Sequence, residues 1–164
     1  MINKAAATFV ASLALAISSG AAQAQISDDV VKIGVLTDMS SLYSDATGKG
    51  SLIATQMAVA DFGGKVKGKP IVVLSGDHQN KPDVGVNIVR NWVDNDKLDA
   101  VFDVPTSSVA LAVSTLLTEK NKIFINSGGG SSDLTGKACS PIFVHYTYDT
   151  YALSSVAGKA MVKR

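Results

Sequence analysis

Residues 30–36 read VVKIGVL, a run of mostly branched apolar residues that a single lysine interrupts. Similar apolar runs recur at 71–74, 100–104 and 123–125, and longer segments separate them. Strands of a parallel sheet that is covered on both faces have such continuous apolar sequences. The repeated order therefore predicts the α/β class, as a Rossmann-like parallel sheet with helices on both faces.

The segments between these runs have the periodicity of helices. Val84, Ile88 and Trp92 follow i, i+4, i+8 spacing, which predicts a helix whose apolar side covers the sheet and places Trp92 in the core. The other helices are predicted around 52–59, around 109–117 and from near Thr150 onward. No repeat or proline-rich linker interrupts the order, so we expect one continuous domain.

The first 24 residues have the pattern of a secretory signal. Lys4 supplies a positive start, the thirteen residues 5–17 carry no charge, and Ala22-Gln23-Ala24 has the small-x-small pattern that signal peptidase requires. A membrane anchor is the alternative, but a bilayer-spanning helix needs roughly 20 apolar residues. We therefore expect cleavage after Ala24 and a mature domain, residues 25–164, outside the cytoplasm.

The composition limits the class of partner and the kind of site. The 164 residues are 46% hydrophobic and 18% charged, which suits one globular domain. The formal charge is only +1, so no basic field is present to hold nucleic acid. One cysteine and two histidines are too few for a Cys/His zinc site or a disulfide framework. We expect no metal, no cofactor and no nucleic acid partner.

The chain lacks the motifs of common catalytic sites. No G-x-G-x-x-G follows the first strand, and neither G-x-S-x-G nor H-E-x-x-H occurs. Residues 48–51, GKGS, depart from a phosphate-binding loop because Tyr43 occupies the position of its first glycine. An enzyme is therefore disfavoured. An exported enzyme that uses Asp77 and His78 stays open as an alternative.

The candidate binding residues lie in the loops that follow the predicted strands. In an open parallel sheet the ligand crevice lies beyond the carboxyl ends of the strands. Hydroxyl groups and free N–H groups at a helix start hold carboxylates well, and glycines let a ligand approach the main chain. The candidates are Ser40, Ser41, Tyr43, His78, Gln79, Thr106, Ser107, Ser108, Gly128, Gly129, Gly130 and Ser131.

Each candidate loop also has a purely structural interpretation. Residues 106–108 fit helix capping as well as ligand contact, and residues 128–130 fit a flexible turn. For Asp38 and Asp77 we favour ordering of their loops over direct ligation. For His78 we favour hydrogen bonding at the surface over catalysis.

Two stretches, VKIGVLTDMS at 31–40 and DHQNKP at 77–82, carry a family resemblance together with the Gly-Lys-Gly that begins at Gly48. They resemble the periplasmic substrate-binding proteins of ABC transporters, in the leucine/isoleucine/valine-binding branch of the type I fold. The resemblance extends to residues 105–108 and 126–134. It implies two α/β lobes that close about a hinge on a small solute.

The resemblance implies a function and a role for each loop. The protein would capture a small carboxylate or polar solute in the periplasm for an ABC permease of the inner membrane. Residues 106–108 match the segment that holds the ligand carboxylate, and residues 128–131 match a second carboxylate loop. Residues 40–43 match the loop that shapes the far end of the pocket, and residues 78 and 79 match the cleft rim. Glycines stand where amino-acid binders commonly have Ala, Ala and Thr, so aliphatic amino acids, aromatic acids, amides and urea all stay open.

The length of the chain leaves further alternatives. Members of this family are more than twice as long, so we expect an incomplete first lobe without its second lobe. A ligand-sensing receptor ectodomain of the same fold and a nonfunctional truncated remnant are the rival interpretations. Because a lone thiol is unusual in an oxidising compartment, we hypothesise that Cys139 pairs with a cysteine beyond Arg164.

Overall fold

The computed structural model describes residues 26 and 28–163, so the predicted signal and its cleavage site lie outside the described residues. The strands are β1 (Val31–Thr37), β2 (Lys65–Val66), β3 (Lys69–Asp77), β4 (Ala100–Asp103), β5 (Ile123–Asn126) and β6 (Phe143–His145). The helices are α2 (Gly48–Asp61), α3 (Pro82–Asp94), α4 (Ser107–Glu119) and α5 (Thr150–Val162), with a short 3-10 helix, η1 (Ser132–Leu134). The predicted strands and helices are all present, whereas β2, β6 and η1 were not predicted.

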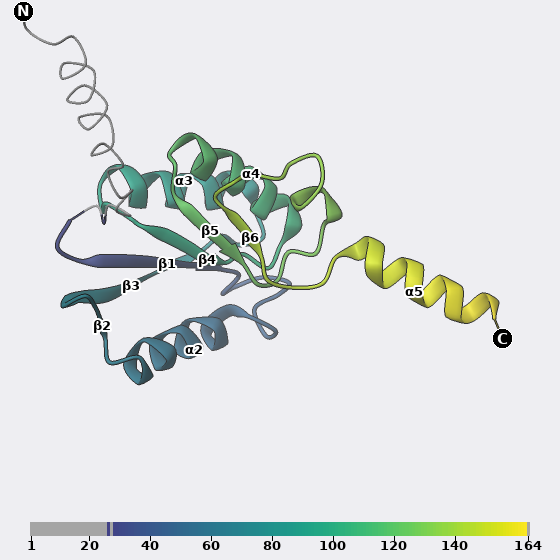
Figure 1. Ribbon diagram of the computed structural model, residues 1–164, viewed down its shortest axis with the longest axis horizontal. Helices are drawn as coiled ribbons and strands as arrows, with labels where there is room; N and C mark the ends of the chain where they lie inside the picture. The colour runs from purple at the N-terminus through teal and green to yellow at the C-terminus, as the bar shows by residue number, and fades with distance from the viewer. Residues whose placement is uncertain (1–25, 27, 164) are drawn as a thin grey trace, which may run out of the picture.

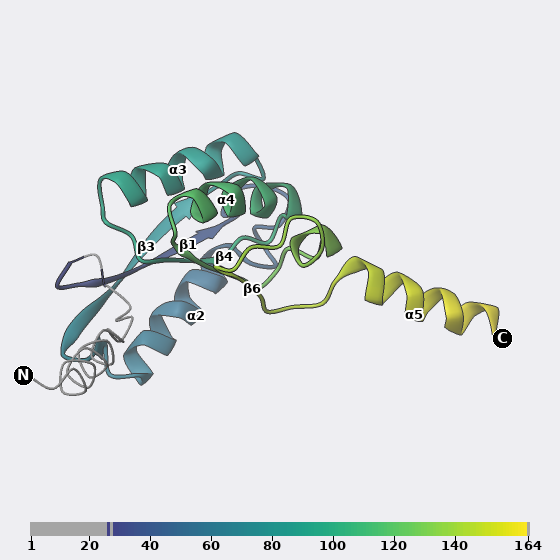
Figure 2. The same cartoon turned by 45° about the horizontal axis from the view of Figure 1, so that its top comes forward.

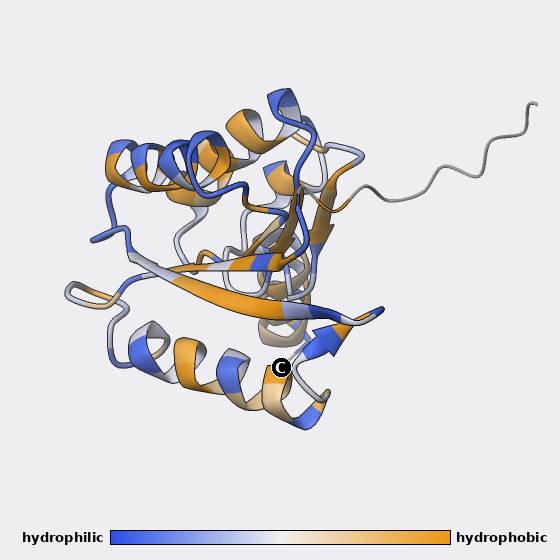
Figure 3. Cartoon of the chain, turned by 90° about the vertical axis from the view of Figure 1, so that its left-hand side faces the viewer, coloured by the Kyte–Doolittle hydropathy of each residue, from blue (hydrophilic) through white to orange (hydrophobic). Residues whose placement is uncertain are grey.

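The sheet has the strand order β2-β3-β1-β4-β5-β6. The strands from β3 to β6 are parallel, and only the short β2 runs antiparallel, beside β3. The chain moves from β1 outward to β3 and then returns past β1 to β4, so the direction of winding reverses at β1. Right-handed crossovers on the two sides of β1 place their helices on opposite faces of the sheet. Figure 3 shows α2 below the sheet and α3 and α4 above it, which confirms the α/β class with helices on both faces.

The core lies between the sheet and the helices α3 and α4. Val89, Val113 and Phe124 are fully buried there, and Trp92 is 7% exposed, as its helical spacing predicts. The Trp92 ring lies directly against the backbone of Gly34: a Cβ at that glycine would stand 2.6 Å from the ring. The indole ring of Trp92 therefore fits against β1 because Gly34 has no side chain.

The helices α2 and α5 contribute little to this core. The only buried residue of α2 is Gly48, and α5 has no buried residue. In Figures 1 and 2, α5 extends away from the sheet at the C-terminal end of the described chain. None of the described helices combines the length and the apolar character that crossing a membrane demands.

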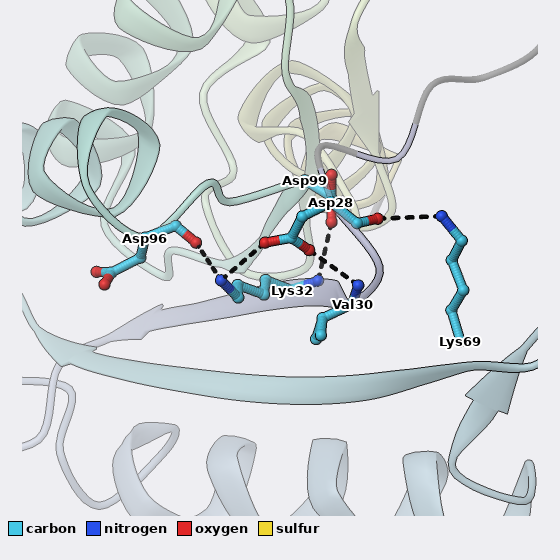
Figure 4. Close-up of polar contacts among 6 residues, drawn as sticks. All are labelled: Asp28, Val30, Lys32, Lys69, Asp96 and Asp99. Carbon is cyan, nitrogen blue, oxygen red and sulfur yellow. Dashed lines mark hydrogen bonds and ion pairs between the residues drawn. The ribbon is translucent and has the colours of Figure 1, made fainter.

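A group of charged residues fixes the amino end of β1 (Figure 4). The Lys32 ammonium donates to the Asp28 carboxylate over 3.2 Å and to the Asp96 carbonyl over 2.7 Å. The Lys69 ammonium donates to the Asp28 carbonyl over 3.1 Å, and the Lys32 N–H donates to the Asp99 carboxylate over 2.9 Å. These contacts anchor the start of the domain at one edge of the sheet and leave the opposite, carboxyl edge to the loops.

Candidate functional site

The loops that hold the predicted site residues all follow strands at the carboxyl edge of the sheet. Thr37 at the end of β1 is in register with Asp77 at the end of β3. Asp103 at the end of β4 is in register with Asn126 at the end of β5. Because the strands are parallel, the loops after them meet at one edge, next to β1, where the winding reverses. Tyr43, Ser107 and Ser131 thus belong to the same side of the molecule.

Asp38 orders the loop after β1 from within. Its Oδ1 accepts the N–H of Ser41 over 2.9 Å. Its Oδ2 accepts the N–H of Tyr43 over 2.9 Å and the Ser41 hydroxyl over 2.6 Å. Burial raises the pKa of the Asp38 carboxyl, but these hydrogen bonds outweigh burial and lower the pKa below its ordinary value of 3.8. Asp38 therefore has the loop-ordering role that the sequence favours.

Asp77 joins the loop after β1 to the loop after β3. Its Oδ1 accepts the N–H groups of Met39 and Gln79, each over 2.9 Å, and its Oδ2 accepts the Ser40 hydroxyl over 2.5 Å. Burial raises the pKa of Asp77, and the hydrogen bonds from Ser40, Met39 and Gln79 reverse that effect, so that the pKa lies below 3.8. Asp77 is thus an ionised link between two of the candidate loops.

The start of α4 contacts the loop after β5. The Ser131 N–H donates a hydrogen bond of 3.2 Å to the Ser107 hydroxyl oxygen. Thr106 is the N-cap residue of α4 but makes no side-chain capping bond, and its buried hydroxyl has no partner within the described part of the chain. The side-chain capping that was the alternative for Thr106 is therefore not observed.

A strained turn connects β4 to α4. Asp103 and Val104 have φ of 78° and 59°, in the left-handed region that a branched residue such as valine rarely occupies. The Asn126 side-chain amide donates to both of their carbonyl oxygens, over 2.9 Å to Asp103 and 2.7 Å to Val104. This role of Asn126 was not predicted, although its place directly after the predicted strand at 123–125 was the available signal.

The three glycines after β5 are required by close packing. A Cβ at Gly128 would lie 2.8 Å from Pro105, one at Gly129 would lie 3.1 Å from the Asn126 amide, and one at Gly130 would lie 2.9 Å from the Tyr148 ring. None of the three is among the residues of positive φ. Protein atoms therefore occupy the places where side chains would stand at these three positions. Contact of a ligand with their main chain stays a prediction.

His78 is fully buried, so the predicted surface role is wrong. Its Nδ1 accepts the N–H of Asn80 over 3.0 Å, and its Nε2 has no partner among the residues that the structure describes. Burial lowers the pKa of His78 below 6.5, against the opposing charges of Asp38, Asp77 and Asp103. The side chain packs beside the start of α3: a Cβ at Gly85 would stand 3.5 Å from that of His78, which is an ordinary contact distance.

The remaining candidates differ in their exposure. Exposed residues are Ser40, Tyr43, Gln79 and Ser108; half-buried residues are Ser41, Thr106, Ser107, Gly128 and Ser131; buried residues are Gly129 and Gly130.

An open cavity of about 520 Å³ lies between the loop after β1 and the start of α2, with Met39, Ser44 and Lys49 in its wall. This cavity does not reach Ser107 or Ser131. Contact of one ligand with both the loop after β1 and these two serines therefore stays a prediction. Within the described ranges, no cluster of three His, Cys, Asp or Glu residues suits a metal ion.

A family model described as "Periplasmic binding protein" matches residues 30–164. The chain belongs to this periplasmic binding protein family. The family resemblance seen in the sequence is therefore confirmed, and so is the type I fold.

Solved and curated relatives agree with this assignment. A periplasmic binding protein from Burkholderia mallei is 50% identical, with a TM-score of 0.80, over 82% of this chain and 36% of that chain. A branched chain amino acid ABC transporter periplasmic ligand-binding protein from Burkholderia xenovorans is 38% identical, with a TM-score of 0.76, over 81% of this chain and 36% of that chain. The Leu/Ile/Val-binding protein homolog 3 of Brucella melitensis is 27% identical over 82% of this chain and 36% of that protein. The periplasmic binding protein chain described here thus spans little more than a third of the length of these relatives.

Proposed function

We propose that this chain is part of the solute-binding component of an ABC importer. The component works in the periplasm, after cleavage behind Ala24, and delivers a small carboxylate or polar solute to a permease in the inner membrane. The observation that carries the proposal is the contact between Ser107 and Ser131, because it joins two candidate loops at the carboxyl edge of the sheet.

The start of α4 suits a carboxylate. The first N–H groups of a helix lack intrahelical partners, and the helix dipole favours negative charge there. Thr106 does not cap them with its side chain. The hydroxyl groups of Ser107 and Ser131 stand beside this helix start, so they supply further donors to the same anion.

The contacts of Asp77 and His78 favour binding over catalysis. The Asp77 carboxylate already accepts hydrogen bonds from Met39, Ser40 and Gln79. The Nδ1 of His78 is the acceptor for a backbone N–H, and the ring is fully buried. A general base must reach the proton that it removes. The buried ring of His78 does not meet this requirement, and both oxygens of Asp77 already hold the two loops together.

The relatives narrow the class of solute. The Burkholderia xenovorans relative is named for branched chain amino acid transport and the Brucella melitensis relative for Leu, Ile and Val. We therefore place small organic carboxylates first among the solutes. Members with two lobes close about a hinge, so the chain described here supplies only part of the binding energy and binds weakly.

Calorimetry on the purified chain tests this function. The panel contains L-leucine, L-isoleucine, L-valine, benzoate, urea and acetamide. We expect at least one carboxylate to bind and the Ser107→Ala variant to weaken that binding about tenfold, as for a lost hydrogen bond to a charged group. The matched control is Thr115→Ala, two turns further along α4 on its exposed side. Absence of binding across the panel, or equal losses in the two variants, would refute the proposal.

A further inference from the structure

The hydroxyl groups at the carboxyl edge differ in which of their atoms are already used. The Ser40 hydroxyl donates to the Asp77 carboxylate over 2.5 Å, and the Ser41 hydroxyl donates to the Asp38 carboxylate over 2.6 Å. An ionised carboxylate only accepts hydrogen bonds, so both serine protons are committed. What Ser40 and Ser41 still offer is oxygen lone pairs. We call these two hydroxyls the acceptor end.

The direction of these two hydrogen bonds is fixed at neutral pH. Burial raises the pKa of each carboxyl, yet the hydrogen bonds that each one accepts bring the pKa below 3.8. Asp38 and Asp77 are therefore both ionised in the periplasmic pH range. Neither carboxylate has a proton to return to Ser40 or Ser41.

Ser107 and Ser131 have the opposite polarity. The Ser107 oxygen accepts the N–H of Ser131 over 3.2 Å, and the Ser131 oxygen accepts the N–H of Asp133 over 3.3 Å. Their hydroxyl protons have no recorded acceptor in the described part of the chain, so both are available to a solute. We call these two hydroxyls, which stand beside the start of α4, the donor end.

The spacing of the strands sets the distance between the two ends. The acceptor end lies over the ends of β1 and β3, because Ser40 bonds to Asp77, and the donor end belongs to the loops after β4 and β5. Neighbouring strands lie about 4.8 Å apart, so one to three strand spacings separate the ends by roughly 5–14 Å. A small organic molecule with one polar group at each end spans that distance.

We propose that the site selects a small carboxylate that carries a hydrogen-bond donor at its far end, with the carboxylate at Ser107 and Ser131 and the donor at Ser40 and Ser41. The inference rests on the proposed solute-binding function and makes it more specific. Asp38 and Asp77 act as positioning residues, because they hold the two serine hydroxyls as acceptors.

Two matched pairs of solutes test the proposal by NMR titration of the full chain. Each pair exchanges a terminal hydroxyl for a methyl group of similar size: 4-hydroxybenzoate with 4-methylbenzoate, and 6-hydroxyhexanoate with heptanoate. We expect the hydroxyl member of the better-binding pair to bind about three- to tenfold more tightly, as one gained hydrogen bond provides. Equal or tighter binding of the methyl member would overturn the inference and leave the proposed function standing. No binding of any of the four acids would overturn both.

A double variant assigns the preference to the acceptor end. In the double variant Ser40→Ala/Ser41→Ala, the carboxylates behind the lost hydroxyls lie one hydrogen bond further from the solute. The ratio of the affinity for the hydroxyl acid to the affinity for the methyl acid therefore falls towards one. A general loss of loop order would weaken both members of a pair equally and leave the ratio unchanged, which would contradict the assignment. Thr115→Ala, on the exposed side of α4, is the control and keeps the ratio. If the double variant does not fold, the ratio measured on the unaltered chain still decides the proposal.

Discussion

The side-chain amide of Asn126 donates a hydrogen bond of 2.7 Å to the carbonyl oxygen of Val104. The same amide reaches the carbonyl of Asp103, so one side chain from β5 holds both residues of the left-handed turn after β4. Because this turn leads into Thr106 and Ser107, Asn126 determines where α4 begins. A residue outside the predicted site therefore positions the helix start that we propose to bind a carboxylate.

Replacement of Asn126 tests this positioning role. Asn126→Ala removes both hydrogen bonds and leaves the buried Val104 carbonyl without its donor, while the Asp103 carbonyl keeps the Ser127 N–H over 3.2 Å. We expect the free energy of unfolding to fall by about 1–3 kcal/mol. Asn126→Asp retains the volume but turns an acceptor towards the two carbonyls, so it is at least as destabilising. Urea unfolding of the two variants measures both effects. A loss below about 0.5 kcal/mol, the lower limit for one hydrogen bond, would show that the turn does not need Asn126.

Asp77 gives a prediction for acid unfolding. Its folded-state pKa lies below 3.8, so its contribution to stability is complete above that pH and is lost as the pH falls through the folded-state pKa. We expect Asp77→Asn to unfold more easily than the parent chain at pH 7, and the difference to shrink below pH 4. Asp61→Asn, at the exposed end of α2, is the control for the loss of one carboxylate. A constant difference between parent and Asp77→Asn across this range would contradict the assignment.

His78 gives a separate prediction in a higher pH range. Burial holds its folded-state pKa below 6.5, so the folded chain disfavours the charged ring. Stability is therefore complete above pH 6.5 and declines as the pH falls from there to the folded-state pKa. Asp38 and Asp77 stay ionised in that range and do not contribute to the decline. His78→Asn keeps an acceptor for the Asn80 N–H but does not titrate, and chemical unfolding at pH 7.5, 6.5 and 5.5 will show a flatter profile. An unchanged slope would exclude His78 as the cause.

The contact between Gly34 and Trp92 predicts opposite effects of two glycine substitutions. In Gly34→Ala the new Cβ stands 2.6 Å from the indole ring, which overpacks the core and costs about 1–3 kcal/mol. In Gly50→Ala the new Cβ meets no atom within 4 Å, and alanine favours the helix by up to about 1 kcal/mol. Thermal unfolding will show a lower Tm for the first variant and an equal or higher Tm for the second. A stable Gly34→Ala variant would mean that Trp92 does not pack as described.

The sequence predicts the fold well because burial leaves a direct pattern. Two-sided burial of β1 produces the apolar run at 30–36, and the stripe ending at Trp92 marks the side of α3 that covers the sheet. The short strands β2 and β6 leave no such signal: Lys65 and Val144 are exposed, so neither strand reads as an apolar run. Pattern alone does not separate such strands from loops.

The site was predictable only as a set of loops. Parallel strands bring Ser40, Ser107 and Ser131 to one edge, and that much follows from the order of the elements. The burial of His78 and the close packing of Gly129 against Asn126 depend on contacts between segments distant in the sequence. No spacing along the chain reports such contacts, which explains why the surface role expected for His78 is wrong and why the packing of Gly129 was not predicted.

The most direct test of the account is an amide-resolved NMR titration of the chain with the tightest-binding carboxylate of the panel. We predict that the largest shifts fall on the loops after β1, β4 and β5, with the N–H groups of Ser107 and Ser131 among them. Residues of the charged group at the opposite edge, such as Lys32 and Asp99, will not move. Shifts that centre on that opposite edge or on α5, with none at Ser107 and Ser131, would contradict the claim that the carboxyl edge binds the solute.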